Sequence, residues 1–552
     1  MTYFLFSVIN HKLKNKFNTI NLKSMKKILL VILTLFIFHN SNSQIKKAPE
    51  RFRGEGPFNQ LIIRGATIIN GNGAPPTGPV DIVIEKNIIK SIRNVGYPGL
   101  EIKESRRPVA KPGAKEIDAH GKYVLPGLID MHGHISSQRE GTAEYVFKLW
   151  MAHGITTIRD PSCGQGLDWV LHQKEESKKN SITAPRILAY TSFGQGEKNG
   201  INTPEEAINW VRKNADRGAD GIKFFGSRPD IFKAALQENK RLGLRSACHH
   251  AQMDVAEMNV IETARNGLTT MEHWYGLPEA LFENKTVQNY PVEYNYMNEG
   301  DRFEEAGKLW EQAAEPYSKK WNDVMNELIS LDFTIDVTFV PYSVFRDVQR
   351  ASSLPWHKDY TRPKLLKFFL PARDSHAAAY YDWGSELETV WKENYKLWMT
   401  FINEYKNRGG RVTAGADSGY MYNLYGFGYV QELELLREAG FHPMEVIRAA
   451  TLHAAEAIGM EDKIGTVETG KFADLVIMDQ NPLKNLKYLY ATGDIKLENN
   501  EVIRVGGVSK TIKDGIIFDA RELLKDVKKI VDEEKSNTPG WEKLLFENIQ
   551  RK

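Results

Sequence analysis

The chain has 552 residues, a formal net charge of +3 and nearly equal numbers of acidic and basic residues. This length allows a large buried core and more than one domain. The balanced charge, with no basic stretch mixed with aromatic residues, argues against nucleic acid as a partner. The two cysteines, Cys163 and Cys248, are too few for a disulfide framework or a zinc knuckle.

The N-terminus has the features of a secretory signal peptide. From Met25 the sequence reads MKKILLVILTLFIF, and small polar residues follow up to Ser43. The apolar run is too short for an ordinary membrane-spanning helix, although a single membrane anchor is the alternative. We therefore predict that residues 1–43 are an upstream extension followed by a signal peptide. The protein is then exported to the periplasm or secreted, with no stable membrane insertion once the signal is removed.

Short strands are predicted near both ends of the chain. Apolar and polar residues alternate, with Gly and Asn between the runs, in residues 60–125 and again in 461–520. This pattern favours antiparallel strands, and we predict that the two segments form one small β-sandwich. Residues 44–59 are basic and polar and are predicted to be a disordered linker, and residues 521–552 a C-terminal helical tail.

The central region, residues 126–460, alternates strand-like and helical runs. Helical spacing and a glycine stop mark residues 205–218 and 254–267, for example. Eight βα repeats predict an α/β fold of the (β/α)8 (TIM) barrel type, with a doubly wound open sheet as the competing architecture. The eight candidate strands are 127–132, 155–160, 186–191, 220–225, 244–249, 268–273, 334–340 and 411–416.

Two connections in this region, 274–333 and 341–410, are far longer than usual. In a barrel both would rise from the C-terminal face, where active sites of this fold lie. Their tryptophan and tyrosine content suggests a lid or a substrate wall. A packed subdomain or a contact between copies of the chain is the alternative, so self-association into a homo-oligomer is left open.

Candidate metal ligands lie where the predicted strands end. His132 and His134 end the first strand, and because side chains alternate along a strand they point the same way. Two imidazoles so spaced can bind one metal ion. Lys223 lies within the apolar fourth strand, where its ordinary role would be to pair with a buried acid.

Three further strands end in residues of the same kinds. The fifth ends in His249 and His250, the sixth in His273 and the eighth in Asp417. Each alone has an ordinary explanation, such as a satisfied polar residue, a helix cap or a turn residue. Together at one end of a barrel they indicate a metal site, because imidazole and carboxylate ligands hold catalytic zinc and related ions.

Three stretches resemble the amidohydrolase superfamily of metal-dependent hydrolases. LPGLIDMHGH, at residues 125–134, is similar to its first-strand signature, and GITTIRD, at 154–160, resembles its second-strand segment. Residues 450–479 resemble the stretch that leads from the last barrel helix back into the β domain. The resemblance extends over residues 60–520 and is strongest to the imidazolonepropionase-like and Xaa-Pro dipeptidase-like branch.

The resemblance implies a site for two divalent metal ions. Zinc is favoured, although manganese, cobalt and iron also suit these ligands. Lys223, once carboxylated by carbon dioxide, would bridge the ions, because a bare ammonium group cannot ligate a cation. The implied ligands are His132, His134 and Asp417 for the more buried ion, and His249 and His273 for the second ion.

Two details of this site remain open from the sequence. Adjacent strand residues point to opposite faces, so only one of His249 and His250 can be the strand ligand. The family pattern favours His249, which leaves His250 to face the substrate. Tyr275 and Tyr342 are predicted either to contact substrate or an oxyanion, or to pack beneath the long connections. The histidines expected in ordinary roles are His153, His357, His376, His442 and His453.

The sequence therefore predicts an exported metal-dependent hydrolase of C–N bonds in amides, small peptides or cyclic amides, with dipeptidase- or prolidase-like activity. A hydroxide formed from metal-coordinated water would attack the carbonyl, and Asp417 would transfer the proton to the leaving nitrogen. The partner is a small molecule or short peptide. The alternatives are a deaminase, a lactonase or phosphotriesterase, and a non-catalytic binding or scaffold protein.

Overall fold

The computed structural model describes residues 45–135, 141–376, 378–380 and 382–549. The predicted signal peptide lies outside these residues. None of the helices that are described is both long and apolar enough to cross a membrane.

The central region contains eight parallel strands in one sheet, in the order β13-β12-β11-β10-β9-β8-β7-β6. Each predicted strand is present, and each pairs in parallel with its neighbours. The prediction of an α/β fold of the TIM type is therefore confirmed. The strands are β6 (Leu128–Asp130), β7 (Ile155–Asp160), β8 (Arg186–Ser192), β9 (Gly221–Phe224), β10 (Arg245–Cys248), β11 (Thr270–Glu272), β12 (Thr334–Asp336) and β13 (Arg411–Thr413).

Backbone hydrogen bonds join the two ends of this strand order. The N–H of Met131, just after β6, donates to the carbonyl of Ala414, just after β13, at 3.1 Å. The N–H of Asp417 donates to the carbonyl of His132 at 2.9 Å. The first and last strands are thus brought together at their C-terminal ends, where the predicted ligands lie.

The helices that alternate with these strands begin at clear capping signals. The α5 helix (Pro204–Asp216) starts with a capping box between Thr203 and Glu206, which closely matches the predicted 205–218. The predicted helix 254–267 is shorter, because Asn259 caps α7 (Val260–Arg265) and the residues before it form turns. The other helices that alternate with the strands are α3 (Ala143–Ala152), α4 (Leu167–Lys178), α6 (Pro229–Arg241), α16 (Phe427–Glu438), α17 (Pro443–Ala449) and α18 (Leu452–Ala457).

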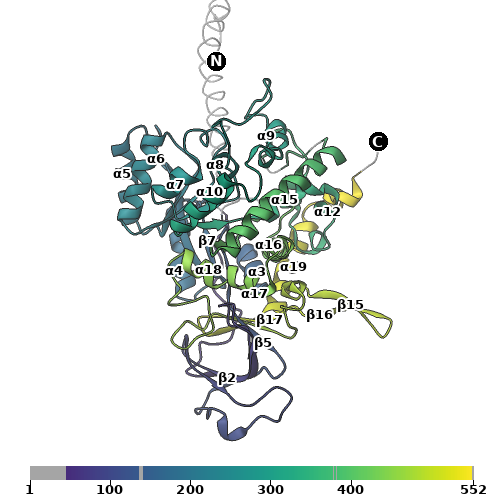
Figure 1. Ribbon diagram of the computed structural model, residues 1–552. Helices are drawn as coiled ribbons and strands as arrows, with labels where there is room; N and C mark the ends of the chain where they lie inside the picture. Colours follow the sequence, from purple (N-terminus) through teal and green to yellow (C-terminus); the bar gives the residue numbers. More distant parts are fainter. Residues whose placement is uncertain (1–44, 136–140, 377, 381, 550–552) are drawn as a thin grey trace, which may run out of the picture. The chain divides into compact units, whose positions relative to one another are not determined.

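The N- and C-terminal segments build one mixed sheet, in the order β18-β17-β14-β5-β1-β2-β3, with β4 paired to β1 (Figure 1). The predicted combination of the two segments is confirmed. The expectation of purely antiparallel strands is wrong, because β1 pairs in parallel with both β4 and β5. The strands are β1 (Leu61–Ile68), β2 (Thr77–Glu85), β3 (Ile88–Asn94), β4 (Lys115–Asp118), β5 (Tyr123–Pro126), β14 (Leu475–Met478), β17 (Val508–Lys513) and β18 (Ile516–Asp519).

The two ends of the mixed sheet also meet. The N–H of Ala473 donates to the carbonyl of Asn87 in the β2–β3 turn, and the N–H of Gly515 in the β17–β18 turn donates to the carbonyl of Ala473. Side chains from both ends, such as Ile84 and Ile512, belong to one buried core. The separate hairpin of β15 (Asp494–Glu498) and β16 (Glu501–Val505) extends beside this sheet.

Residues 45–59 differ from the predicted disordered linker. Lys46 bridges to Thr142 and Glu50 bridges to Ile182, so the segment is held along the barrel by backbone hydrogen bonds. Ile45 is buried. The polar composition of this segment suggested disorder, but its backbone groups find partners that are distant in the sequence and that local composition cannot indicate.

The long connections contain helices of their own. Residues 274–333 carry α8 (Leu277–Ala280), α9 (Glu299–Ala306) and α10 (Lys319–Ser330). The second connection carries α11 (Phe339–Arg346), α12 (Val348–Ser352), α13 (His357–Tyr360), α14 (Pro363–Phe369) and α15 (Ser385–Asn407). Buried tryptophans of the long α15 helix, such as Trp391 and Trp398, pack against Trp274 and Tyr342 beside the barrel.

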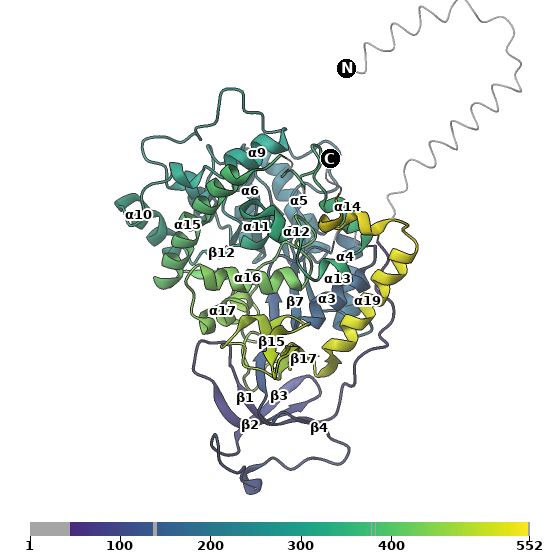
Figure 2. The ribbon, with the colours of Figure 1, turned by 90° about the vertical axis from the view of Figure 1, so that its right-hand side faces the viewer.

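The C-terminal helix α19 (Ala520–Ser536) packs against α3 (Figure 2). Asp526 of α19 accepts hydrogen bonds from Lys148 of α3 at 2.9 Å and from Arg53 at 2.6 Å. Lys148 is buried, with 1% of its surface exposed. A single carboxylate therefore joins the start of the described chain, the first barrel helix and the last helix.

We expect Asp526→Ala to lower the free energy of unfolding by about 1–3 kcal/mol, because it removes a hydrogen-bonded partner from a buried ammonium group. Urea unfolding followed by circular dichroism measures this change. The matched control is Asp532→Ala on the same helix, whose carboxylate pairs with the solvent-exposed Lys528. Equal stability of the two variants would show that Asp526 does not hold α19 in place.

Candidate metal centre

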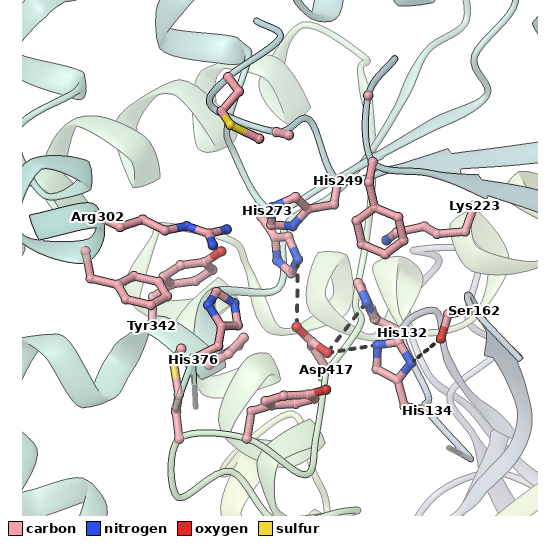
Figure 3. A pocket seen from close by; sticks show the side chains of 18 of the residues that line it. His132, His134, Ser162, Lys223, His249, His273, Arg302, Tyr342, His376 and Asp417 are labelled. Carbon is pink, nitrogen blue, oxygen red and sulfur yellow. Dashed lines mark hydrogen bonds and ion pairs between the residues drawn. The ribbon is translucent and has the colours of Figure 1, made fainter. Parts of the chain in front are cut away.

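A cavity of about 530 Å³ lies at the C-terminal ends of the barrel strands (Figure 3). It brings together residues that are more than 280 positions apart in the sequence, since both His132 and Asp417 line it. All of the sequence-predicted ligands from the matched family pattern line this cavity. They are His132, His134, Lys223, His249, His273 and Asp417.

The segment after β6 is held by Asp130. One carboxylate oxygen of Asp130 accepts from the backbone N–H of His132 at 3.1 Å and of Ala416 at 3.0 Å, and the other accepts from the indole of Trp150 at 3.1 Å. Gly133 fits closely here, because an added Cβ would lie 3.1 Å from the Trp150 ring. These contacts explain the spacing of the motif: an acid anchors the turn and a glycine lets two histidines face the cavity.

The carboxylate of Asp417 lies at the centre of the cluster (Figure 3). Its Oδ1 is 3.1 Å from Nε2 of His134 and 3.6 Å from Nε2 of His132, and its Oδ2 is 3.7 Å from Nε2 of His273. Asp417 has a φ of 45°, in the left-handed region that non-glycine residues seldom adopt. Such strained backbone is concentrated at functional sites, and His273 shares it with a φ of 60°.

His249 and His273 stand edge to face, with ring centroids 4.9 Å apart. The backbone N–H of His249 donates to the carbonyl of Phe224, which places the histidine just beyond β10. Nδ1 of His273 is hydrogen-bonded to the hydroxyl of Thr338, which leaves Nε2 directed at Asp417. A hydrogen bond at one ring nitrogen orients the other as a ligand, as in many metal sites.

His250 points away from this cluster. It is buried against α7, where its Nε2 is 2.8 Å from the hydroxyl of Thr263, and it is absent from the described residues that line the cavity. The structure therefore favours His249 as the candidate ligand. It places His250 outside the cavity lining, where it does not face a substrate bound in the cavity. The physical reason is strand alternation, which sends neighbouring side chains to opposite sides.

Lys223 extends from β9 into the cavity wall. Its Nζ is 4.0 Å from Oε2 of Glu272, and it is a buried nitrogen without a hydrogen-bond partner among the described residues. Burial lowers the pKa of Lys223 from its usual value. A deprotonated amine is the form that reacts with carbon dioxide, so this environment suits the predicted carboxylation.

Beneath the cluster lies an ion network that the sequence analysis missed. Arg159 of β7 is fully buried, and its guanidinium donates to both oxygens of Glu272, at 2.9 and 2.7 Å, and to Asp336 at 3.2 Å. Glu272 Oε2 is in turn 2.8 Å from Nδ1 of His132. The signal was present in the strands GITTIRD and TTMEHW, where charged residues interrupt apolar runs next to candidate ligands.

The network shifts the pKa values of its two carboxyl groups, Glu272 and Asp336, in opposite directions. Burial alone would raise the pKa of Glu272, but Arg159 and Lys223 hold it well below its usual range. Burial and the Glu272 charge instead raise the pKa of Asp336 well above its usual value. The guanidinium of Arg159 thus stabilises the ionised form of Glu272, while the pKa of the neighbouring Asp336 shifts in the opposite direction.

The histidines of the cluster favour the neutral form that binds metal ions. Burial lowers the pKa of His132 to about 4 and of His273 to about 3, and it lowers the pKa of His249 well below the usual value. His134 is the exception: burial lowers its pKa, but the hydrogen bond to Asp417 and the charges of Asp417 and Asp160 together outweigh burial and raise it. Burial would also raise the pKa of Asp417, but the surrounding histidines hold it below its usual range.

These residues fit a divalent metal ion. One ligand atom each from His132, His273 and Asp417 lie within 4.8 Å of one another. The set offers imidazole nitrogens and a carboxylate oxygen, the donors that suit zinc and related ions. His249 and Lys223 line the same cavity, where they could contribute to a second ion once Lys223 is carboxylated.

The other wall of the cavity comes from the long connections. Tyr342 lines the cavity, whereas Tyr275 is absent from the described lining residues and packs behind His249, with ring centroids 5.4 Å apart. For Tyr275 the position favours aromatic packing over substrate contact. His376, expected in an ordinary role, lines the cavity together with Arg302, which no motif or strand position singled out.

Comparison with known proteins adds an independent line of evidence. The sequence profile of the "Amidohydrolase family" matches residues 398–517. An adenine deaminase of Methanoculleus marisnigri is 48% identical over 92 residues, which are 15% of this chain and 18% of that protein. An imidazolonepropionase of Shouchella clausii is 31% identical over 101 residues, which are 18% of this chain and 21% of that protein. The matches to the first curated relatives span about a fifth of those proteins' length.

The fold comparison covers much more of the chain. The crystal structure of a Xaa-Pro dipeptidase with bound methionine in the active site superposes with a TM-score of 0.54, covering 83% of this chain and all of that one at 18% identity. The profile match over residues 398–517 and the shared fold thus relate the chain to the amidohydrolase superfamily. The predicted relation to its imidazolonepropionase-like and Xaa-Pro dipeptidase-like members is confirmed.

We expect Arg159→Met to lower the free energy of unfolding by about 3–5 kcal/mol, because it leaves the buried Glu272 without its hydrogen-bonded guanidinium and with only the more distant Lys223 as a cation. Urea unfolding measures the change. Arg228→Met is the control, since Arg228 pairs with Asp230 at the exposed surface and its loss should leave the stability nearly unchanged. If both variants lose the same small amount, the buried network does not support the barrel as described.

Proposed function

We propose that this protein is a metal-dependent hydrolase that cleaves the C–N bond of an amide or short peptide. The observation that carries the proposal is the convergence of Asp417 with imidazoles from three strand ends in one cavity. A divalent ion held there lowers the pKa of coordinated water and polarises the substrate carbonyl. Zinc suits the ligands best, and manganese, cobalt or iron also fit.

Asp417 is placed to move the proton of the reaction. Water adds to the carbonyl carbon, one of its protons passes to a carboxylate oxygen of Asp417, and the same proton goes to the nitrogen as the C–N bond breaks. Hydrogen bonding from His134 keeps Asp417 ionised and ready to accept. Tyr342 lines the same cavity, and burial raises its pKa well above 10, so its phenol stays protonated and can donate to the oxygen of the former carbonyl.

Export belongs to the proposal as well. It is supported by the lysine pair, apolar run and small polar residues between Met25 and Ser43.

Asp417→Asn should abolish turnover, by about a thousandfold or more, because an amide cannot accept the proton. The fold should persist, as shown by an unchanged circular dichroism spectrum. Hydrolysis of a panel of dipeptides and N-acyl amino acids, with zinc, manganese or cobalt added, measures the effect. Near-normal turnover by a metal-loaded Asn variant would contradict the proton-transfer role.

Lys223→Ala should reduce bound metal from two ions per chain to one, because it removes the bridging carbamate. Elemental analysis of the purified protein gives the metal content, and ¹³C NMR after exposure to ¹³C-bicarbonate detects the carbamate in the wild type. Lys174→Ala is the control, since Lys174 pairs with Asp220 on the outside of the barrel. Two ions in the Lys223 variant would contradict the bridging role.

A deaminase is the second candidate, favoured by the identity to an adenine deaminase over 92 residues. A deaminase would release ammonia from an amino-purine, whereas a peptidase would release an amino acid with a new free amino group. Assays for ammonia and for new amino groups therefore tell the two functions apart. Lactones and phosphotriesters, added to the substrate panel, test the lactonase and phosphotriesterase alternatives. A protein that binds no metal and turns over none of these compounds would be a binding or scaffold relative.

A further inference from the structure

The cavity contains a cation that its own surroundings leave incompletely paired. Arg302 reaches it from α9, in the connection 274–333, and Figure 3 shows its guanidinium extending toward His273. Its Nε is buried without a hydrogen-bond partner among the described residues. Glu299, one turn earlier, is 3.7 Å from the guanidinium, and its other oxygen bonds Nδ1 of His376 at 2.8 Å. Arg302 therefore keeps donors free for a ligand.

The same cavity contains an acid without a cationic partner. Asp254 lies in the turn after β10 and lines the cavity. In the part of the chain that the structure describes, no ion pair or side-chain hydrogen bond joins its carboxylate to another residue. Partial burial raises its pKa, a cost that a bound cation would offset. Gly226 makes room for it, because an added Cβ would lie 2.2 Å from the Asp254 carboxylate.

These two charges do not neutralise each other, since no ion pair within 4.0 Å links Arg302 to Asp254 among the described residues. The ring of Tyr296 lies against the guanidinium, 4.4 Å from its carbon. Apolar and aromatic side chains complete the wall, including Phe225, Met253 and Tyr420. The cavity therefore offers one positive and one negative group, separate from each other, beside the candidate metal ligands.

An unblocked dipeptide has the complementary pattern of charge. It carries an ammonium group at one end and a carboxylate at the other, with the amide bond between them. A planar guanidinium binds a carboxylate through two parallel hydrogen bonds, and a carboxylate binds an ammonium ion. The cavity volume of about 530 Å³ is in the range of small-ligand sites and allows a dipeptide.

We propose that Arg302 binds the free carboxylate of a dipeptide substrate and Asp254 its free amino group, so that the site selects dipeptides with both ends unblocked. This inference rests on the proposed function, because the amide bond between those ends is the bond to be cleaved. It disfavours cyclic amides, which have no free amino end, and N-acyl amino acids, which have only the carboxylate.

Binding tests the inference apart from turnover. Leucyl-leucine and leucyl-proline are titrated by calorimetry into the zinc-loaded Asp417→Asn protein, each beside its N-acetylated form and its C-terminal amide. Blocking either end should weaken binding roughly tenfold or more, about 1.4 kcal/mol. Equal binding of blocked and unblocked forms, or no binding of either dipeptide, would overturn the inference.

Variants assign the two ends separately in the same background. Arg302→Met should weaken binding of the free dipeptides but leave the C-terminal amides unchanged, and Arg302→Lys should restore part of the loss. Asp254→Asn should weaken the free dipeptides but leave the N-acetylated forms unchanged. Asp301→Asn is the control, because Asp301 adjoins Arg302 on α9 but is absent from the described lining residues. Equal losses for all ligands with either variant would contradict the assignment.

Failure of this inference can be told apart from failure of the proposed function. If the wild-type protein cleaves amides but the end groups make no difference, the inference fails and the hydrolase proposal stands. If the binding pattern holds while the wild-type protein cleaves no dipeptide, the hydrolase proposal fails instead.

Discussion

The buried guanidinium of Arg159 is the interaction on which the site depends. It extends from β7 and donates to the carbonyl of Met131 after β6, to Glu272 at the end of β11 and to Asp336 at the end of β12. A single side chain thereby ties together strands that are far apart in the sequence. Glu272 adjoins His273 and contacts His132, so the position of both candidate ligands depends on a cation that itself touches neither substrate nor metal.

Next to this network, burial and the close approach of the histidines to Asp417 set the protonation states of the candidate ligands. Burial keeps the imidazoles of His132, His249 and His273 neutral, while the histidines around Asp417 keep that carboxylate ionised. Neutral imidazole and ionised carboxylate are the states that bind divalent ions. The left-handed backbone at His273 and Asp417 shows that the fold holds these side chains in place against a local conformational cost.

The long connections complete the cavity at the C-terminal ends of the barrel strands. The strand ends supply the candidate metal ligands, whereas Arg302 comes from α9 and Tyr342 from α11, both in the connections that follow the sixth and seventh strands. Residues placed on connections can change without disturbing the strands, which is why barrels of this type serve many reactions. Much of the cavity wall beside the candidate ligands therefore comes from the long connections rather than from the strand ends.

The sequence by itself determined the eight strands, the joining of the two terminal segments into one sheet and the candidate residues at the strand ends. These features depend on local alternation and on motif order, which one chain displays directly. The tertiary structure alone decided that His249 rather than His250 faces the cavity and that Arg159 joins Glu272 and Asp336. It also decided that Arg302 and Asp254 line the cavity beside the candidate ligands. It also placed residues 45–59 along the barrel. The physical reason is that these contacts join residues distant in the sequence, whose orientation is set by packing that no local pattern records.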